Sequence, residues 1–112
     1  MKALYVMQYA GQESAGAGAL YVGDGHILGV DVGNCRYKGS YTMQDGRLKG
    51  TATMSAPPDR QAILVTGTAL QPGQSIPLEV DWPENLGDGQ PRTVSVAGRQ
   101  VHVVFEKVDD IP

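Results

Sequence analysis

The side chains that could bind a metal ion or act as a nucleophile are few in this sequence and lie far apart. The two histidines are His26, directly after an Asp-Gly turn, and His102, on the polar side of an expected strand. Cys35 is the only cysteine, and no His-x-x-x-His or Cys-x-x-Cys spacing is present. A zinc site needs three or four suitably spaced ligands. We therefore expect solvated histidines, no metal site and no cofactor.

Nucleophilic and acid-base catalysis also lack a recognisable pattern. No serine lies in the sequence pattern of a nucleophile elbow. The acidic residues show no paired spacing typical of glycoside hydrolysis. Cys35 is expected to be inert, although the neighbouring Arg36 would favour a thiolate. The sequence therefore predicts a protein that is not an enzyme.

Asp31 is a carboxylate with two open interpretations. It ends an apolar stretch and precedes Gly33-Asn34. It could bind a ligand or exchange a proton. Alternatively, its oxygens could accept hydrogen bonds from the N–H groups of the following loop, as Asp commonly does in turns. We favour the second interpretation from the sequence.

Aromatic and thioether side chains could line a ligand cavity. The candidates are Tyr5, Tyr37, Tyr41, Met43, Met54 and Trp82. An eight-stranded barrel has an interior just wide enough to be filled by side chains or to hold one small ligand. Small inward residues at Gly39, Gly50 and Ala52 would leave room for a ligand. Plain core packing by the same aromatic residues is the alternative that we favour.

Tight turns would position these residues. Asp24-Gly25 and Asp45-Gly46 each lie between runs that alternate apolar and polar residues, which is a strong hairpin signal. The chain has 15 glycines in 112 residues, about twice the average usage, which favours short strands over helices. Turn signals at intervals of about 8–12 residues are typical of an all-β sandwich or barrel.

Alternation predicts which side chains face inward. In Tyr37–Met43 the inward face carries Tyr37, Tyr41 and Met43, and in Val101–Lys107 it carries Val101, Val103 and Phe105. One apolar and one polar face per strand is the antiparallel pattern.

Two segments depart from simple alternation. Ala62–Leu70 is predicted as a strand that is buried on both faces or covered by another segment. Pro77 has no N–H group, so Ile76–Trp82 is predicted to lie at a sheet edge or to carry a bulge. An edge there is the natural place for a barrel to open or for a partner to pair.

Composition limits the remaining function classes. We expect one domain over residues 1–112. The net charge is −3 and no basic run is interleaved with aromatic residues, which argues against nucleic-acid binding. No apolar stretch approaches the roughly 18 residues of a membrane span. The N-terminus lacks the features of a signal peptide, and a lone cysteine suits a reducing compartment, so we expect a cytoplasmic protein.

An ordered set of motifs in the first half of the chain resembles the GrlR-like family. This family comprises small bacterial proteins named for a negative regulator of type III secretion. The resemblance covers roughly residues 2–54. The motifs are Leu4-Tyr5, Gly16-x-Gly18, Asp24-Gly25, Gly29-Val30-Asp31 and Tyr37-x-Gly39-x-Tyr41.

The resemblance implies an all-β fold, a small antiparallel up-and-down barrel of about eight strands that is calycin-like or lipocalin-like. It also implies a homodimer and a regulatory role through contact with another protein. The protein-binding candidates are Gln44, Asp45, Gly46 and Arg47, at the hairpin tip that is acidic in the family and has one acidic residue here. We thus expect a non-enzymatic regulatory or binding protein. The alternative is a carrier of a small apolar ligand held by Tyr5, Tyr37, Tyr41 and Trp82.

Overall fold

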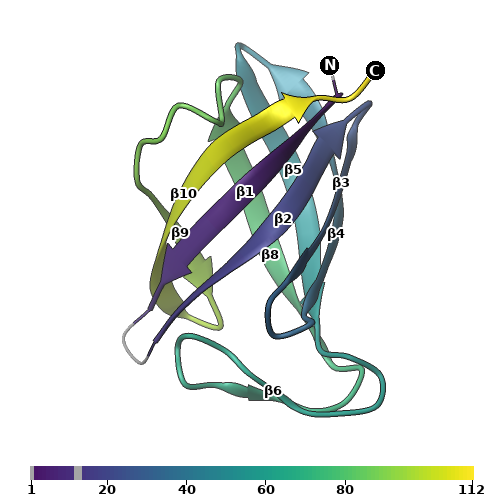
Figure 1. Ribbon diagram of the computed structural model, residues 1–112, viewed down its shortest axis with the longest axis vertical. Helices are drawn as coiled ribbons and strands as arrows, with labels where there is room; N and C mark the ends of the chain where they lie inside the picture. Colours follow the sequence, from purple (N-terminus) through teal and green to yellow (C-terminus); the bar gives the residue numbers. More distant parts are fainter. Residues whose placement is uncertain (1, 12–13) are drawn as a thin grey trace.

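The computed structural model describes residues 2–11 and 14–112 (Figure 1). Within these ranges the chain forms strands and no helix, so no helix is available to cross a membrane. The strands are β1 (Lys2–Ala10), β2 (Ala15–Gly23), β3 (His26–Asp31), β4 (Arg36–Gln44), β5 (Arg47–Ser55), β6 (Ala62–Ile63), β7 (Ala69–Leu70), β8 (Ser75–Pro83), β9 (Arg92–Val96) and β10 (Arg99–Asp110).

Eight of these strands form one antiparallel sheet that curls into a nearly closed barrel (Figure 1). The order in the sheet is β8-β5-β4-β3-β2-β1-β10-β9. Each strand follows its predecessor up and down, and β10 returns to pair with β1. The two edges, β8 and β9, lie side by side without belonging to a common hydrogen-bonded ladder. The predicted all-β up-and-down barrel of about eight strands is confirmed.

The place in the barrel wall where β8 and β9 lie side by side without a shared ladder is called the seam. It lies where the sequence predicted a sheet edge from Pro77. Pro77 is in β8, and β8 ends the sheet order. A proline cannot donate a ladder hydrogen bond, which suits an edge strand. The prediction that Ile76–Trp82 lies at an edge where the barrel opens is confirmed.

Two hairpins follow directly from the Asp-Gly pairs. Asp24 and Gly25 have φ angles of 52° and 81°, and Asp45 and Gly46 have 53° and 77°. Positive φ at both central residues is the signature of the turn whose twist matches paired antiparallel strands. These turns connect β2 to β3 and β4 to β5, so the local chemistry fixes the register of half the sheet.

The barrel core collects the inward side chains of the alternating strands. Val101, Val103 and Phe105 are buried, as predicted from alternation. Met43 pairs with buried Leu48 and so lies on the predicted inward face, but 46% of it is exposed. β3 pairs with β4 only as far as Ser40, so Met43 extends past the neighbouring strand.

Residues 56–74, called the end cap below, close the lower end of the barrel in Figure 1. The prediction of one strand over Ala62–Leu70 is wrong. Gly67, with a φ of 85°, lies in a turn that folds the segment back on itself, and only the two-residue strands β6 and β7 pair. Leu64 and Leu70 are buried. The segment is thus a lid of side chains over the barrel rather than a member of its wall.

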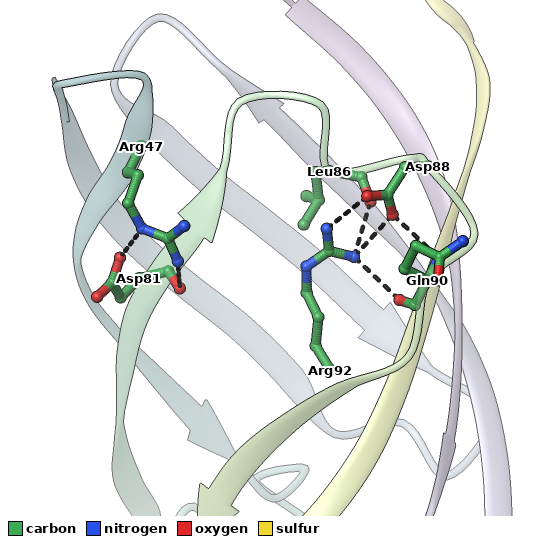
Figure 2. A network of polar contacts seen from close by, with 6 residues as sticks. All are labelled: Arg47, Asp81, Leu86, Asp88, Gln90 and Arg92. Atoms are coloured by element: carbon green, nitrogen blue, oxygen red, sulfur yellow. Dashed lines mark hydrogen bonds and ion pairs between the residues drawn. The ribbon is translucent and has the colours of Figure 1, made fainter.

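Arginine side chains form ion pairs on both sides of the seam, in the part of the barrel away from the end cap (Figure 2). Nε of Arg47 on β5 donates to Oδ1 of Asp81 on β8 at 2.6 Å. On the other side, Arg92 makes two bonds of 2.9 Å to the two carboxylate oxygens of Asp88. The Arg92 guanidinium lowers the pKa of Asp88 to about 2, and the hydrogen bond from Arg47 lowers the pKa of Asp81. Both pairs therefore stay ionised across the neutral range. The first links β5 to β8, and the second links the loop between β8 and β9 to the start of β9.

Candidate functional site

A cavity of about 290 Å³ lies inside the barrel, next to the end cap. Most of its lining residues are apolar, and they come from the sheet and from the end cap. An apolar cavity of about 150 Å³ holds benzene, so this one has room for on the order of ten non-hydrogen atoms. Examples of the apolar lining are Leu20, Ile27, Leu64, Val80, Val103 and Phe105.

Asp31 forms the polar end of this cavity. Its Oδ1 accepts hydrogen bonds from the N–H groups of Gly33 at 2.9 Å and Cys35 at 3.0 Å. Its Oδ2 accepts hydrogen bonds from the hydroxyls of Tyr9 at 2.9 Å and Tyr37 at 2.8 Å. The expectation that loop N–H groups bind this carboxylate is confirmed. The two tyrosine bonds are additional, and Tyr9, Asp31 and Tyr37 are called the Asp31 cluster below.

Glycines on β2 bring the cluster together. Tyr9 pairs with Gly16 across the β1–β2 ladder, and Gly18 pairs with Asp31 across the β2–β3 ladder. A Cβ atom at Gly16 would lie only 2.7 Å from the ring and hydroxyl of Tyr9. The missing side chain lets the Tyr9 ring lie across β2 and reach Asp31 on the strand beyond.

Burial and the carboxylate keep the surrounding groups protonated. Burial, followed by the charge and hydrogen bond of Asp31, raises the pKa of Tyr9 and of Tyr37. Burial and Asp31 also raise the pKa of the Cys35 thiol to about 11, against the weaker opposing effect of Arg36. Cys35 is buried in the cavity wall and stays a neutral thiol at neutral pH, as expected.

The structure divides the four predicted ligand-binding aromatics between the two ends of the barrel. Tyr37 and Trp82 line the cavity. Tyr5 is buried at the other end, where Gly87 lies close to its ring. Tyr41 packs against the core but is absent from the cavity wall. Inward alternation identifies the core face of a strand but not which end of the barrel a residue occupies.

Tyr9 is the site residue that sequence reasoning missed. The signal that could have found it is the pairing of an inward aromatic residue with glycine on the next strand. That signal becomes visible only when the β1–β2 register is known.

The hairpin tip Gln44–Arg47 lies at the opposite end of the barrel from the end cap, because it joins the far ends of β4 and β5. Gln44, Asp45 and Arg47 are exposed. Arg47 is already committed to Asp81, and the carbonyl of Gly46 accepts a hydrogen bond from the N–H of Glu84 at 3.0 Å. The tip is accessible to a partner but carries no concentration of one charge.

In the described ranges 2–11 and 14–112, no three His, Cys, Asp or Glu side chains lie close enough together to hold a metal ion. The Asp31 cluster itself contains a single carboxylate. Its four hydrogen bonds already use the acceptor capacity of that carboxylate.

A surface groove along the seam leads toward the cavity. The groove is lined by residues of β5, β8 and β9, and it shares Leu78, Trp82 and Val94 with the cavity wall. Since β8 and β9 share no ladder, separating them here breaks no strand pairing. The seam is thus the part of the barrel wall that opens with least loss of backbone hydrogen bonds.

No known family model matches this chain, and no curated protein is significantly similar to it.

Proposed function

We propose that this protein binds a small, largely apolar molecule inside its barrel and does not transform it. The observation that carries the proposal is the cavity of about 290 Å³, which is largely apolar and has polar groups at the Asp31 cluster and at Ser14 and Gln61. A concave, mostly apolar site with a few convergent polar groups is the usual form of a small-molecule site. This favours the carrier alternative of the sequence analysis over plain core packing.

The size of the cavity supports the proposal. Protein interiors are close-packed, with few voids larger than a water molecule. A hollow of about 290 Å³ is far larger than such voids. A bound apolar molecule that fills it would remove the apolar lining from water, which is favourable.

The chemistry of the Asp31 cluster supports binding without a reaction at this site. The four acceptor positions of Asp31 are occupied, so the carboxylate has no free lone pair to act as a general base. The hydroxyls of Tyr9 and Tyr37 and the thiol of Cys35 are held protonated, so none is an activated nucleophile at neutral pH. A neutral buried thiol also suits the cytoplasmic location that we propose.

The proposal predicts saturable binding that a filled cavity abolishes. Trp82 is the only tryptophan and lines the cavity, so its fluorescence reports occupancy by octan-1-ol. Ala62→Phe fills the cavity from the end cap and is expected to weaken binding by at least about tenfold. Ala69→Phe is the matched control, because Ala69 is exposed on the same small hairpin. No saturable change in the wild type, or equal affinity in a folded Ala62→Phe, would refute the proposal.

A second candidate function, protein–protein contact, is favoured by one surface observation. Leu28, Val30 and Val32 expose 57%, 45% and 79% of their area on and just after β3. Contiguous exposed apolar residues often mark an interaction site. A regulatory role of the GrlR-like kind would use this face, the outer β3 face, or the hairpin tip Gln44–Arg47.

Charges on the two sides of the outer β3 face suit a second copy of the chain. Arg36 and Lys38 lie on β4, next to β3. Glu106 and Asp109 lie on β10, beyond β1 and β2. Two copies related by a twofold axis can place the basic side of one against the acidic side of the other.

Homodimerisation through the outer β3 face predicts that Val30→Glu produces a monomer in sedimentation measurements. Thr53→Glu, on the exposed face of β5, is the control and leaves the dimer intact. A wild-type protein that stays monomeric at the highest concentration measured would remove this candidate.

A further inference from the structure

The hydroxyl groups at the polar end of the cavity are oriented as acceptors. Tyr9 and Tyr37 each use their single hydroxyl proton to donate to Oδ2 of Asp31. A phenolic hydroxyl has one proton and two acceptor lone pairs. Each hydroxyl therefore offers a ligand only lone pairs. A ligand group that meets them must itself donate a hydrogen bond.

The charge at this end of the cavity is negative. Asp31 accepts four hydrogen bonds and donates none, which is the bonding of an ionised carboxylate. Its hydrogen-bond partners are two N–H and two O–H groups, none of them a cation. Among the described residues that line the cavity, Asp31 is the only Asp, Glu, Lys or Arg. The interior thus carries a negative charge, and no Lys or Arg lines the described cavity wall.

Aromatic rings line the same space. Tyr9, Tyr37, Trp82 and Phe105 contribute to the wall. The face of an aromatic ring attracts a cation, and it does so more strongly where water is excluded. Acceptor hydroxyls, a negative charge and aromatic faces all favour the same kind of ligand group.

From these observations we infer that the ligand is a small amine. Its protonated amino group donates to the hydroxyls of Tyr9 and Tyr37, and its apolar body, on the order of ten non-hydrogen atoms, fills the rest of the cavity. This inference rests on the proposed function and names its ligand class.

The same geometry discriminates against carboxylates. A ligand anion would meet two oxygens that have no proton to give and a carboxylate roughly 5–6 Å away, one hydroxyl beyond them. At an effective dielectric constant of about 20, a unit charge at that distance changes affinity by roughly a hundredfold. Fatty acids, which share the apolar body, are therefore expected to bind far more weakly than amines of equal length.

A matched series of three probes tests the inference by Trp82 fluorescence and calorimetry at pH 7: octylamine, octan-1-ol and octanoate. We expect octylamine to bind tightest, octan-1-ol roughly a hundredfold less tightly, and octanoate roughly a further hundredfold less tightly than octan-1-ol. Saturable binding in which octan-1-ol or octanoate equals or exceeds octylamine would overturn the inference and leave the proposed function standing. Failure of all three probes would overturn both.

Variants separate the cavity charge from the overall negative charge of the protein. Asp31→Asn is expected to remove the preference for octylamine over octan-1-ol. Asp24→Asn makes the same change in net charge at an exposed hairpin turn and is expected to retain the preference. Tyr37→Phe keeps the carboxylate but removes one acceptor, and it is expected to weaken octylamine several-fold. If the preference for octylamine over octan-1-ol persists unchanged in both Asp31→Asn and Tyr37→Phe, the inference is contradicted. If Asp31→Asn does not fold, the affinity of Tyr37→Phe for octylamine is the test by itself.

Discussion

Asp31→Ala is expected to lower the free energy of unfolding by about 3 kcal/mol. The carboxylate accepts hydrogen bonds from Gly33, Cys35, Tyr9 and Tyr37, which tie the loop after β3 to β1 and β4. Removing it leaves four donors without their acceptor. Three of them are partly buried, and the loss per partly buried donor is about 1 kcal/mol. Urea unfolding followed by circular dichroism measures the change.

Two tyrosine variants measure how much of this loss comes from each tyrosine hydrogen bond, and a third is their control. Tyr9→Phe and Tyr37→Phe are each expected to cost about 1–2 kcal/mol, because each removes one hydrogen bond to a charged group. Tyr21→Phe, which removes a hydroxyl from the outward face of β2, is expected to change stability by less than about 0.5 kcal/mol. Combining Asp31→Ala with Tyr9→Phe should cost less than the sum of the two. A loss under about 1 kcal/mol for Asp31→Ala would mean that water replaces the carboxylate without penalty.

The parts of the fold that the sequence predicted well are those fixed by neighbouring residues. Asp24-Gly25 and Asp45-Gly46 adopt the positive φ angles that their chemistry favours, and the flanking strands follow from them. Pro77 placed its strand at an edge for an equally local reason, the missing N–H group. Such features need no knowledge of the rest of the chain.

The end cap and the Asp31 cluster were not predicted, because both depend on distant contacts. Tyr9 and Asp31 are separated by 22 positions in the sequence and by a whole strand in the sheet. Alternation along β1 and β3 shows that Tyr9 and Asp31 both face inward. Which residues lie opposite them on the neighbouring strands follows only from the register of the sheet. The apolar run Ala62–Leu70 has the composition of a buried strand. It is buried because it covers the open end of the barrel. Its own sequence does not show which part of the fold it will cover.

Phe105→Ala is expected to cost about 3–5 kcal/mol, at least as large a loss as that expected for Asp31→Ala. Phe105 on β10 is 2% exposed, and its ring lies against Trp82 on β8, with centroids 5.0 Å apart and planes at 50°. These two strands lie on opposite sides of the seam, where no ladder holds the edges. The aromatic contact therefore helps to hold β8 and β10 together, as backbone hydrogen bonds hold neighbouring strands together elsewhere in the barrel. Urea unfolding measures the loss, and Val104→Ala, on the other face of the same strand, is the control.

The same variant connects stability to binding. Removing the ring enlarges the cavity, since Phe105 is part of its wall. Decylamine should then bind Phe105→Ala more tightly than octylamine does, whereas in the wild type the extra carbons have less room. Saturating decylamine should also restore part of the lost stability, because a ligand that binds only the folded state stabilises it by mass action. A loss similar to that of Val104→Ala, with no change in chain-length preference, would mean that Phe105 neither closes the seam nor bounds the site.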